Sequence, residues 1–172
     1  MNQGIKLRQK IHSILLDIFK YGNSVEMTYK KYSINNLSKR DRAFINNVSL
    51  NSMRFYFHTY KIIKKFTKKV PGLQERILLV SSITQIVFLD FKSYAVINSS
   101  VEVAKSNNIY HNFINAILNK ISKQKKLLKE VKVNFTDFPL WFIKLTDNIS
   151  KNEKNEFLIN FKNEPHLHLV FK

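Results

Sequence analysis

The sequence contains no cysteine among its 172 residues. This absence excludes disulfide bonds, cysteine-ligated zinc sites and cysteine nucleophiles, and with them the small secreted proteins that depend on disulfides. Glycine and proline are also scarce, with three residues of each. Because many short strands require the turn chemistry of these two residues, their scarcity favours helices over strands.

Long hydrophobic runs are missing as well. The most apolar stretch, residues 77–91, is shorter than the roughly 20 residues of a membrane-spanning helix, and it contains four polar residues: Ser81, Ser82, Thr84 and Gln85. Near the N-terminus, charged and polar residues from Lys6 to Asp17 interrupt the apolar ones and leave no signal-peptide core. We therefore expect a cytoplasmic protein in which residues 77–91 form a buried helix.

Acidic residues are few: the chain has 12 Asp and Glu against 29 Lys and Arg, for a formal net charge of +17. A compositional drift towards Lys would spread this charge evenly, but residues 1–76 hold 16 basic and 4 acidic residues, whereas residues 134–172 hold five of each. The excess therefore lies in residues 1–133. Such an excess of positive charge is typical of a protein that binds a polyanion, and nucleic acid is the polyanion that it favours first. An anionic membrane surface is the alternative, but no segment combines a basic face with an exposed aromatic face.

Apolar residues recur at helical spacing in successive segments, which predicts an all-α fold. The first helix covers residues 7–19 and ends at Gly22. The second begins after the N-cap Ser38 and runs towards Ile62. Further helices are expected at residues 73–89, 94–106, 139–149 and 152–161. Another is expected to follow Asn107 and Asn108 and to hold Phe113, Ala116, Ile117 and Ile121 on one stripe. The charged stretch 123–132 marks the expected boundary between a domain of residues 1–133 and a helical connector of residues 134–172.

No motif in the sequence supports catalysis or metal binding. It contains no glycine-rich phosphate loop and no Ser/His/Asp arrangement, and His166 and His168 have no third ligand at metal spacing. The aromatic residues between Phe55 and Phe66 favour core packing over stacking on RNA bases. The run of lysines at 61, 64, 65, 68 and 69 is more typical of a solvated helix end than of a binding site. Because it would attract phosphates, we also consider it as a secondary contact surface.

Three segments resemble the NusB family of RNA-binding helical domains. The first, LRQKIHSILLDIF, is similar to the family's opening helix, and the second, LSKRDRAFINNVSLNSMR, has the family pattern of Leu37 followed by residues 41–44. The third, AVINSSVEVAKSNNIYHNFINAILNKI, is the most specific, with matches at Ala95, Val96, Ile97, Asn98, Val101, Ala104, Lys105, Phe113, Ile114, Asn115, Ala116, Ile117 and Leu118. It departs from the family at Ser99, where a Glu is usual. The resemblance covers residues 5–122 and implies a NusB-like helical bundle.

The remaining segment resembles the connector that follows the NusB-like domain in RsmB/Sun-type ribosomal RNA cytosine-C5 methyltransferases. Pro139 and Trp141 stand where that connector opens a helix, and Pro165, Leu167 and Leu169 stand where it leads into the catalytic domain. The usual Arg of that exit is not matched, since His168 stands nearby. The catalytic domain of those enzymes binds S-adenosylmethionine and attacks cytosine with a Cys. This sequence includes neither such a catalytic domain nor a Cys. The resemblance therefore implies a chain that is not an enzyme by itself and has no cofactor or metal.

These resemblances imply the RNA-recognition domain of a ribosomal RNA methyltransferase, with RNA and a methyltransferase domain as its partners. The alternative is a transcription antitermination factor that binds RNA together with a ribosomal protein, and a pure interaction scaffold is the third hypothesis. The family's RNA surface implies six contact residues: Lys6, Arg8 and Lys10 on phosphates, Lys105 as a neighbouring cation, and Asn112 and Phe113 on bases. For Phe113, packing in the core stays open as an alternative.

Overall fold

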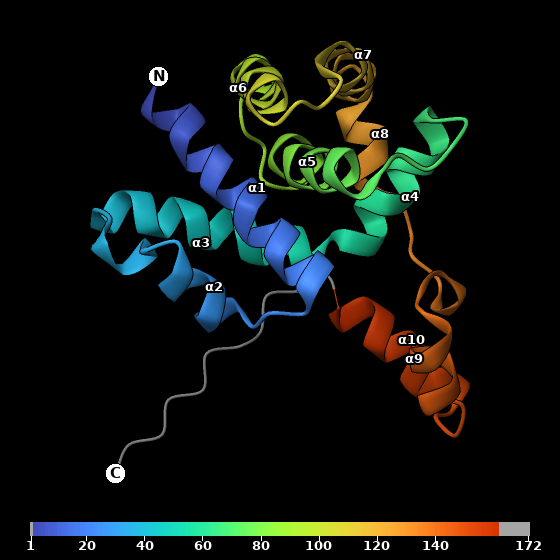
Figure 1. Cartoon of the computed structure of the whole chain (residues 1–172). Helices are drawn as coiled ribbons and strands as arrows, with labels where there is room; N and C mark the ends of the chain where they lie inside the picture. The colour runs from blue at the N-terminus through green and yellow to red at the C-terminus, as the bar shows by residue number, and fades with distance from the viewer. Residues whose placement is uncertain (1, 162–172) are drawn as a thin grey trace. The chain divides into compact units, whose positions relative to one another are not determined.

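The computed structural model describes residues 2–161, and within that range it contains only helices and loops (Figure 1). The predicted all-α fold is therefore confirmed. The chain divides into two compact units, Met1–Val131 and Lys132–Lys172. No helix within residues 2–161 combines the length and the apolar content needed to cross a lipid bilayer. The connector's predicted exit, from Pro165 to Leu169 with both histidines, lies outside the described residues.

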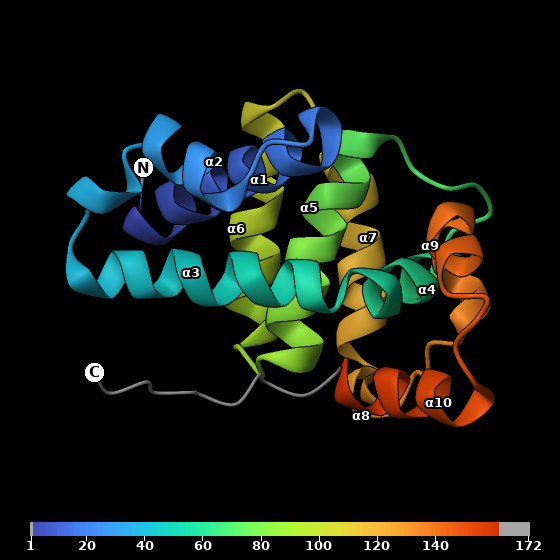
Figure 2. The same cartoon turned by 90° about the horizontal axis from the view of Figure 1, so that it is seen from below.

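The described part of the first unit is built from helices that pack around α5, as Figure 2 shows from below. Helix α5 packs against α1, α3, α4, α6 and α7, and α1 also packs against α2, α3 and α6. Two clusters of buried apolar side chains result, one centred on α5 to α7 and one on α1 and α3. The elements are α1 (Gln3–Tyr21), α2 (Val25–Lys31), η1 (Ile34–Asn36), α3 (Lys39–Arg54), α4 (Tyr56–Phe66), α5 (Leu73–Ile83), η2 (Thr84–Phe88), α6 (Ser93–Ser106), α7 (His111–Ser122) and α8 (Lys125–Lys129).

Helix α1 forms where the apolar spacing predicts it, and both of its ends are capped. Its buried positions include Leu7, Ile11 and Ile14, which lie three or four residues apart and face the core. At the C-terminal end, Gly22 adopts the left-handed conformation with φ of +70°, and its N–H donates to the carbonyl of Ile18 at 3.0 Å. Because glycine reaches this conformation without steric cost, the predicted end of the helix at Gly22 is confirmed.

Helix α5 and the π-helical turn η2 form the buried centre of the unit. Every residue from 77 to 87 is buried, polar ones included, so the predicted buried helix is confirmed. Most of the polar side chains are accommodated by hydrogen bonds within the core: the hydroxyls of Ser82 and Ser100 lie 2.7 Å apart, and the Gln85 amide donates to the carbonyl of Ser81 at 3.0 Å. Burial of these groups is tolerated because each has a partner, whereas the buried Thr84 hydroxyl has none among the described residues.

The structure differs from the sequence-based prediction between residues 38 and 62. The predicted single helix is wrong there, because the chain bends at Phe55 and forms α3 and α4. The Phe55 ring stacks on Phe88 of η2 with centroids 4.2 Å apart and planes 5° apart. No Pro or Gly lies between Ser38 and Phe66 to mark the bend. It coincides with a contact between residues far apart in the sequence.

Two short helices of the first unit were not predicted. Helix α8 lies within the charged stretch 123–132, yet Leu128 is buried in the larger core cluster. Helix α2 has a sequence signal, because Ser24 is a good N-cap and Glu26 lies in the first turn. The Ser24 hydroxyl accepts from the N–H of Met27 at 3.2 Å.

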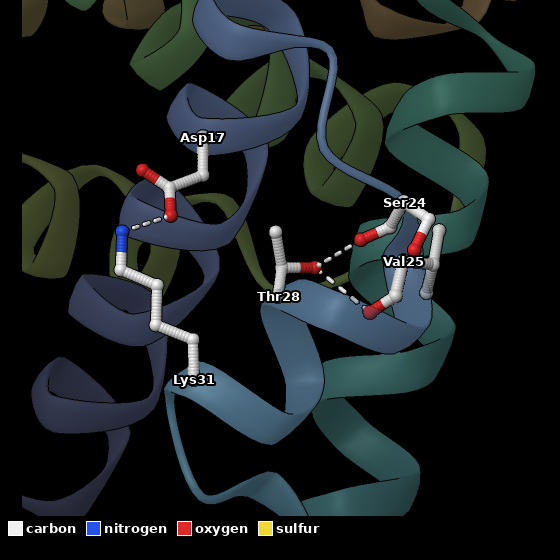
Figure 3. A network of polar contacts seen from close by, with 5 residues as sticks. All are labelled: Asp17, Ser24, Val25, Thr28 and Lys31. Carbon is white, nitrogen blue, oxygen red and sulfur yellow. Dashed lines mark hydrogen bonds and ion pairs between the residues drawn. The ribbon is translucent and has the colours of Figure 1, made fainter.

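An ion pair joins α2 to α1, and a hydroxyl hydrogen bond lies within the first turn of α2 (Figure 3). Lys31 Nζ lies 2.5 Å from Oδ2 of Asp17, whose side chain is almost fully buried. This contact is the largest cause of a raised pKa for the Lys31 ammonium. The Thr28 hydroxyl donates within α2, to the carbonyls of Ser24 (3.1 Å) and Val25 (2.8 Å). The almost fully buried carboxylate of Asp17 therefore has a cationic partner, which reaches it from the surface because the Lys31 side chain is 56% exposed.

The second unit is described from Lys132 to Phe161 and contains η3 (Phe135–Asp137), α9 (Leu140–Leu145) and α10 (Lys151–Asn160). Its centre is a set of phenylalanine rings 5.1 to 5.9 Å apart: Phe135, Phe138, Phe142, Phe157 and Phe161. Pro139 precedes α9, as the pattern predicted. Ser150 and Glu153 form a capping box at the start of α10.

Candidate nucleic-acid interface

The first turns of α1 present the three predicted phosphate contacts, and the structure gives each a different role. Asn2 caps the helix by accepting from the N–H of Gly4 at 3.0 Å, which sets the start of α1. Lys6 is exposed to solvent. Lys10 is half-buried, and its Nζ donates to the backbone carbonyl of Tyr32 at 3.0 Å. Lys6 is therefore the more accessible cation, whereas Lys10 also stabilises the turn after α2 through this hydrogen bond.

Arg8 is half-buried between α1 and the centre of the unit. Its Nε donates to Oε1 of Gln85 at 2.8 Å, one terminal nitrogen donates to the carbonyl of Gly4 at 3.2 Å, and the guanidinium lies 5.2 Å from the centre of the Phe44 ring. Burial lowers the pKa of this guanidinium. A guanidinium has five N–H donors, and these contacts occupy two of its nitrogens. Arg8 thus positions α1 while keeping donors for a ligand.

Two grooves border Arg8, one on each side of the first turns of α1. One groove, of about 390 Å³, lies against α6 and is lined by Tyr94, Asn98 and Ser99 as well as Arg8. The other, of about 330 Å³, lies against α3 and includes Arg40 and Phe44. Both volumes fall in the lower part of the range of about 300 to 1,000 Å³ in which small ligands are bound. Each groove also has one carboxylate in its lining, Glu102 in the first and Asp41 in the second, so a ligand beside Arg8 would meet both a cation and an acid.

The serine that departs from the family pattern lies in the α6 groove. The Ser99 hydroxyl donates within its own helix, to the carbonyls of Ala95 (2.6 Å) and Val96 (3.0 Å). A glutamate at this position would place a carboxylate in the groove that Arg8 lines. With serine there and the neutral Gln85 as the side-chain partner of Arg8, the carboxylate that this groove does contain is Glu102, which is paired with Lys105.

Hydrogen bonds join the C-terminal end of α6 to Gln9 of α1, and the sequence did not predict them. The Gln9 amide oxygen accepts from Ser106 (2.9 Å) and from Asn107 (3.0 Å), and its nitrogen donates to Asn107 at 3.1 Å. The predicted cation Lys105 directly precedes Ser106 and Asn107 and is exposed. Lys105 itself forms an exposed ion pair with Glu102 at 2.7 Å, so its charge is partly offset. Nothing in the spacing of Gln9 and Asn107 signals their contact.

The two predicted base contacts lie in the first turn of α7 and differ in exposure. Asn112 is exposed, whereas Phe113 is half-buried and packs against the larger core cluster. For Phe113 the structure favours the packing alternative. Two tyrosines that the sequence-based analysis did not select, Tyr94 and Tyr110, are each 66% exposed. Since exposed aromatic rings can stack on unpaired bases, these residues are better placed for that role. Their exposure depends on the packing of α6 and α7 and is not readable from spacing.

Replacing Phe113 with alanine is expected to lower the free energy of unfolding by about 2 kcal/mol, because a half-buried ring leaves a smaller cavity than a fully buried one. Tyr110→Ala, three residues earlier, is expected to change it by less than about 0.5 kcal/mol. Urea unfolding followed by far-UV circular dichroism measures both. Equal destabilisation by the two variants would contradict the assignment of Phe113 to the core.

The part of the chain that the structure describes contains no cluster of side chains suited to a metal ion. Among residues 2–161, no three His, Asp or Glu side chains are grouped so that they could hold a metal ion. The expectation that the chain has no metal or cofactor of its own stays a prediction.

Comparison with known proteins gives two findings. The sequence profile of the NusB family matches residues 6–123, a range that contains all six predicted contact residues. The chain is also similar to the transcription antitermination protein NusB of Buchnera aphidicola subsp. Cinara cedri (strain Cc), with 32% identity over 106 residues. This alignment covers 58% of the present chain and 70% of the relative.

Proposed function

We propose that this chain, which belongs to the NusB family, is an RNA-binding transcription antitermination factor. The observation that carries the proposal is the 32% identity to a transcription antitermination protein over 70% of that protein's length. The resemblance implies that the factor works with a protein partner, a ribosomal protein bound alongside a short RNA element. It also implies that the chain is not an enzyme.

The structure supports RNA contact at the start of α1 by charge and by shape. Arg8 lines two grooves, and the α6 groove combines its guanidinium with the exposed ring of Tyr94. Lys6 is an exposed cation on the same turns of α1. A cation next to an aromatic ring suits a nucleotide, because the phosphate pairs with the cation and the base stacks on the ring. Lys105 adds a second cation on the neighbouring helix.

The proposal is tested by titrating the full chain with a labelled single-stranded RNA of about 12 nucleotides at salt concentrations between about 50 and 200 mM. We expect log K to fall with log[salt] with a slope of about −2 or steeper, since each phosphate contact contributes about −0.7. Converting Lys6, Arg8 and Lys10 to alanine is expected to weaken binding at least tenfold and to flatten the slope.

The matched control replaces Lys120, Lys123 and Lys126 with alanine, which removes three charges from exposed positions on α7, on α8 and in the turn between them. It is expected to change the affinity less than threefold. Because Arg8 and Lys10 also make internal contacts, circular dichroism verifies that the triple variant is folded, and Lys6→Gln alone is measured beside it. A flat salt dependence, or equal losses in the triple variant and its control, would refute RNA binding at α1.

A second candidate is the RNA-recognition domain of a ribosomal RNA cytosine methyltransferase. It is favoured by the second unit, where a helix follows Pro139 and carries Trp141 as the connector of those enzymes does. The two candidates predict different partners. Capture of a ribosomal protein by the immobilised chain in the presence of RNA supports antitermination, whereas restored cytosine methylation on adding a separate catalytic domain supports the second candidate.

A further inference from the structure

The longest stretch of the chain without an acidic residue ends at a cluster of lysines far from α1 in the sequence. Residues 42–74 contain no Asp or Glu but include seven cations. Five of these lie between Lys61 and Lys69, at the end of α4 and in the turn that leads to α5. Lys64, Lys65, Lys68 and Lys69 are all exposed.

An aromatic ring organises the cations at this place. Tyr60 of α4 lies under Lys64, whose Nζ is 4.9 Å from the ring centre, and under Arg76 of α5, whose Cζ is 5.7 Å from it. The Tyr60 ring also stacks on Tyr56 with centroids 6.0 Å apart and planes 5° apart. Cation–π contacts of this kind hold long side chains in place and reduce the entropy lost when a ligand binds. We call Tyr60, Lys64, Lys65, Lys68, Lys69 and Arg76 the α4 surface.

Arg76 carries further binding capacity. Its Nε is buried and has no hydrogen-bond partner among the described residues. The buried Nε is itself closed to a ligand, so an anion that reaches Arg76 would accept charge-assisted hydrogen bonds from the terminal nitrogens of the guanidinium. The acid nearest in sequence to the α4 lysines is Glu75, which precedes Arg76 directly.

The α4 surface is distinct from the predicted phosphate contacts Lys6, Arg8 and Lys10, which we call the α1 surface. In both views α4 lies on the opposite side of the first unit from the first turn of α1 (Figures 1 and 2). The two surfaces therefore contact different parts of a bound RNA.

We propose that the α4 surface is a second RNA-binding surface, which takes the phosphate backbone of a longer RNA whose other part occupies α1. This inference rests on the proposed RNA-binding function. Phosphates are the ligand because Lys64, Arg76 and Tyr56 already contact the Tyr60 ring, which leaves little ring area for a base. A lipid bilayer fits this surface less well, because a membrane-binding segment exposes large apolar side chains beside its cations. The exposed apolar residue next to these lysines is Val70, and it is only 45% exposed.

The test compares two RNAs, one of about 12 and one of about 40 nucleotides, since a surface of this size occupies only part of the longer strand. The variant replaces Lys64, Lys65, Lys68 and Lys69 with glutamine, and its control replaces Lys120, Lys123, Lys126 and Lys129 with glutamine. Both remove four charges from exposed lysines of the first unit. We expect the α4 variant to bind the long RNA at least tenfold more weakly, to lose about 2 to 3 from its salt slope, and to bind the short RNA as the unmodified protein does. The control is expected to change each affinity less than threefold.

The outcomes separate the two proposals. If the unmodified protein binds neither RNA, the proposed function fails. If it binds the short RNA through Lys6 and Arg8, but the α4 variant binds the long RNA as tightly as the control does, only the second surface is refuted. Vesicles of phosphatidylcholine with about 30% phosphatidylserine are tested in parallel. Lysine-dependent binding to these vesicles without an effect on the long RNA would also overturn the assignment to RNA.

Discussion

Acidification from pH 7 to pH 4 is expected to lower the free energy of unfolding by about 3 kcal/mol through His12 alone. His12 lies on α1 and is 1% exposed. Burial lowers the pKa of its imidazole from 6.5 to about 4. Neither ring nitrogen has a hydrogen-bond partner among the described residues. The folded protein therefore holds a neutral ring, because a protonated one would place an unpaired charge in the core.

The direction of the effect follows from proton binding. Between pH 6.5 and pH 4 the unfolded chain binds a proton at His12 and the folded chain does not, so the unfolded state gains stability as the pH falls. The contribution of the neutral ring is complete above pH 6.5 and is lost progressively down to about pH 4. Urea unfolding at several pH values measures it by far-UV circular dichroism. Trp141 is unsuitable as a probe, since it lies in the second unit.

Two variants isolate His12 from the carboxylates that titrate in the same range. His12→Gln and His12→Leu both remove the titrating ring, one keeping a polar side chain and the other filling the site with an apolar one. Each is expected to show a pH dependence about 3 kcal/mol smaller than that of the unmodified protein between pH 7 and pH 4. Parallel curves for all three proteins would show that His12 does not contribute.

Local chemistry made some elements predictable and left others out of reach. Helix α1 ends at Gly22 because a glycine supplies the left-handed conformation that the cap requires, and this is readable from one residue. The bend at Phe55 coincides with the stacking of its ring on Phe88, 33 residues later. No local pattern encodes that contact. Helix α8 is short and lysine-rich, and its packing through Leu128 depends on the core formed by other helices.

The candidate site shows the same division. Composition locates the positive charge, and the resemblance selects Lys6, Arg8 and Lys10, but neither reveals how each cation is used. The structure engages Arg8 with Gln85 and Lys10 with the carbonyl of Tyr32. Exposure is also a tertiary property. Phe113 packs against the core while Tyr94 and Tyr110 face solvent, although all three are aromatic residues at or near helix starts.

Replacing Leu79 with alanine is expected to lower the free energy of unfolding by about 3 to 4 kcal/mol, because truncating a fully buried leucine removes apolar contacts and leaves a cavity. Leu79 is completely buried in α5, in the larger core cluster. Leu127→Ala is the matched control, since this leucine of α8 is 71% exposed. The control is expected to change the free energy by less than about 0.5 kcal/mol. Urea unfolding followed by circular dichroism compares the two variants.

The same pair of variants separates stability from binding. Helix α5 packs against both α1 and α4, which carry the two proposed RNA surfaces, but Leu79 contributes no charge to either. Leu79→Ala is therefore expected to bind RNA within about twofold of the unmodified protein at temperatures where circular dichroism shows it folded, because RNA affinity depends on surface cations. A tenfold loss of affinity in the folded variant would show that the α5 core, and not the cations alone, sets the geometry of the RNA surfaces.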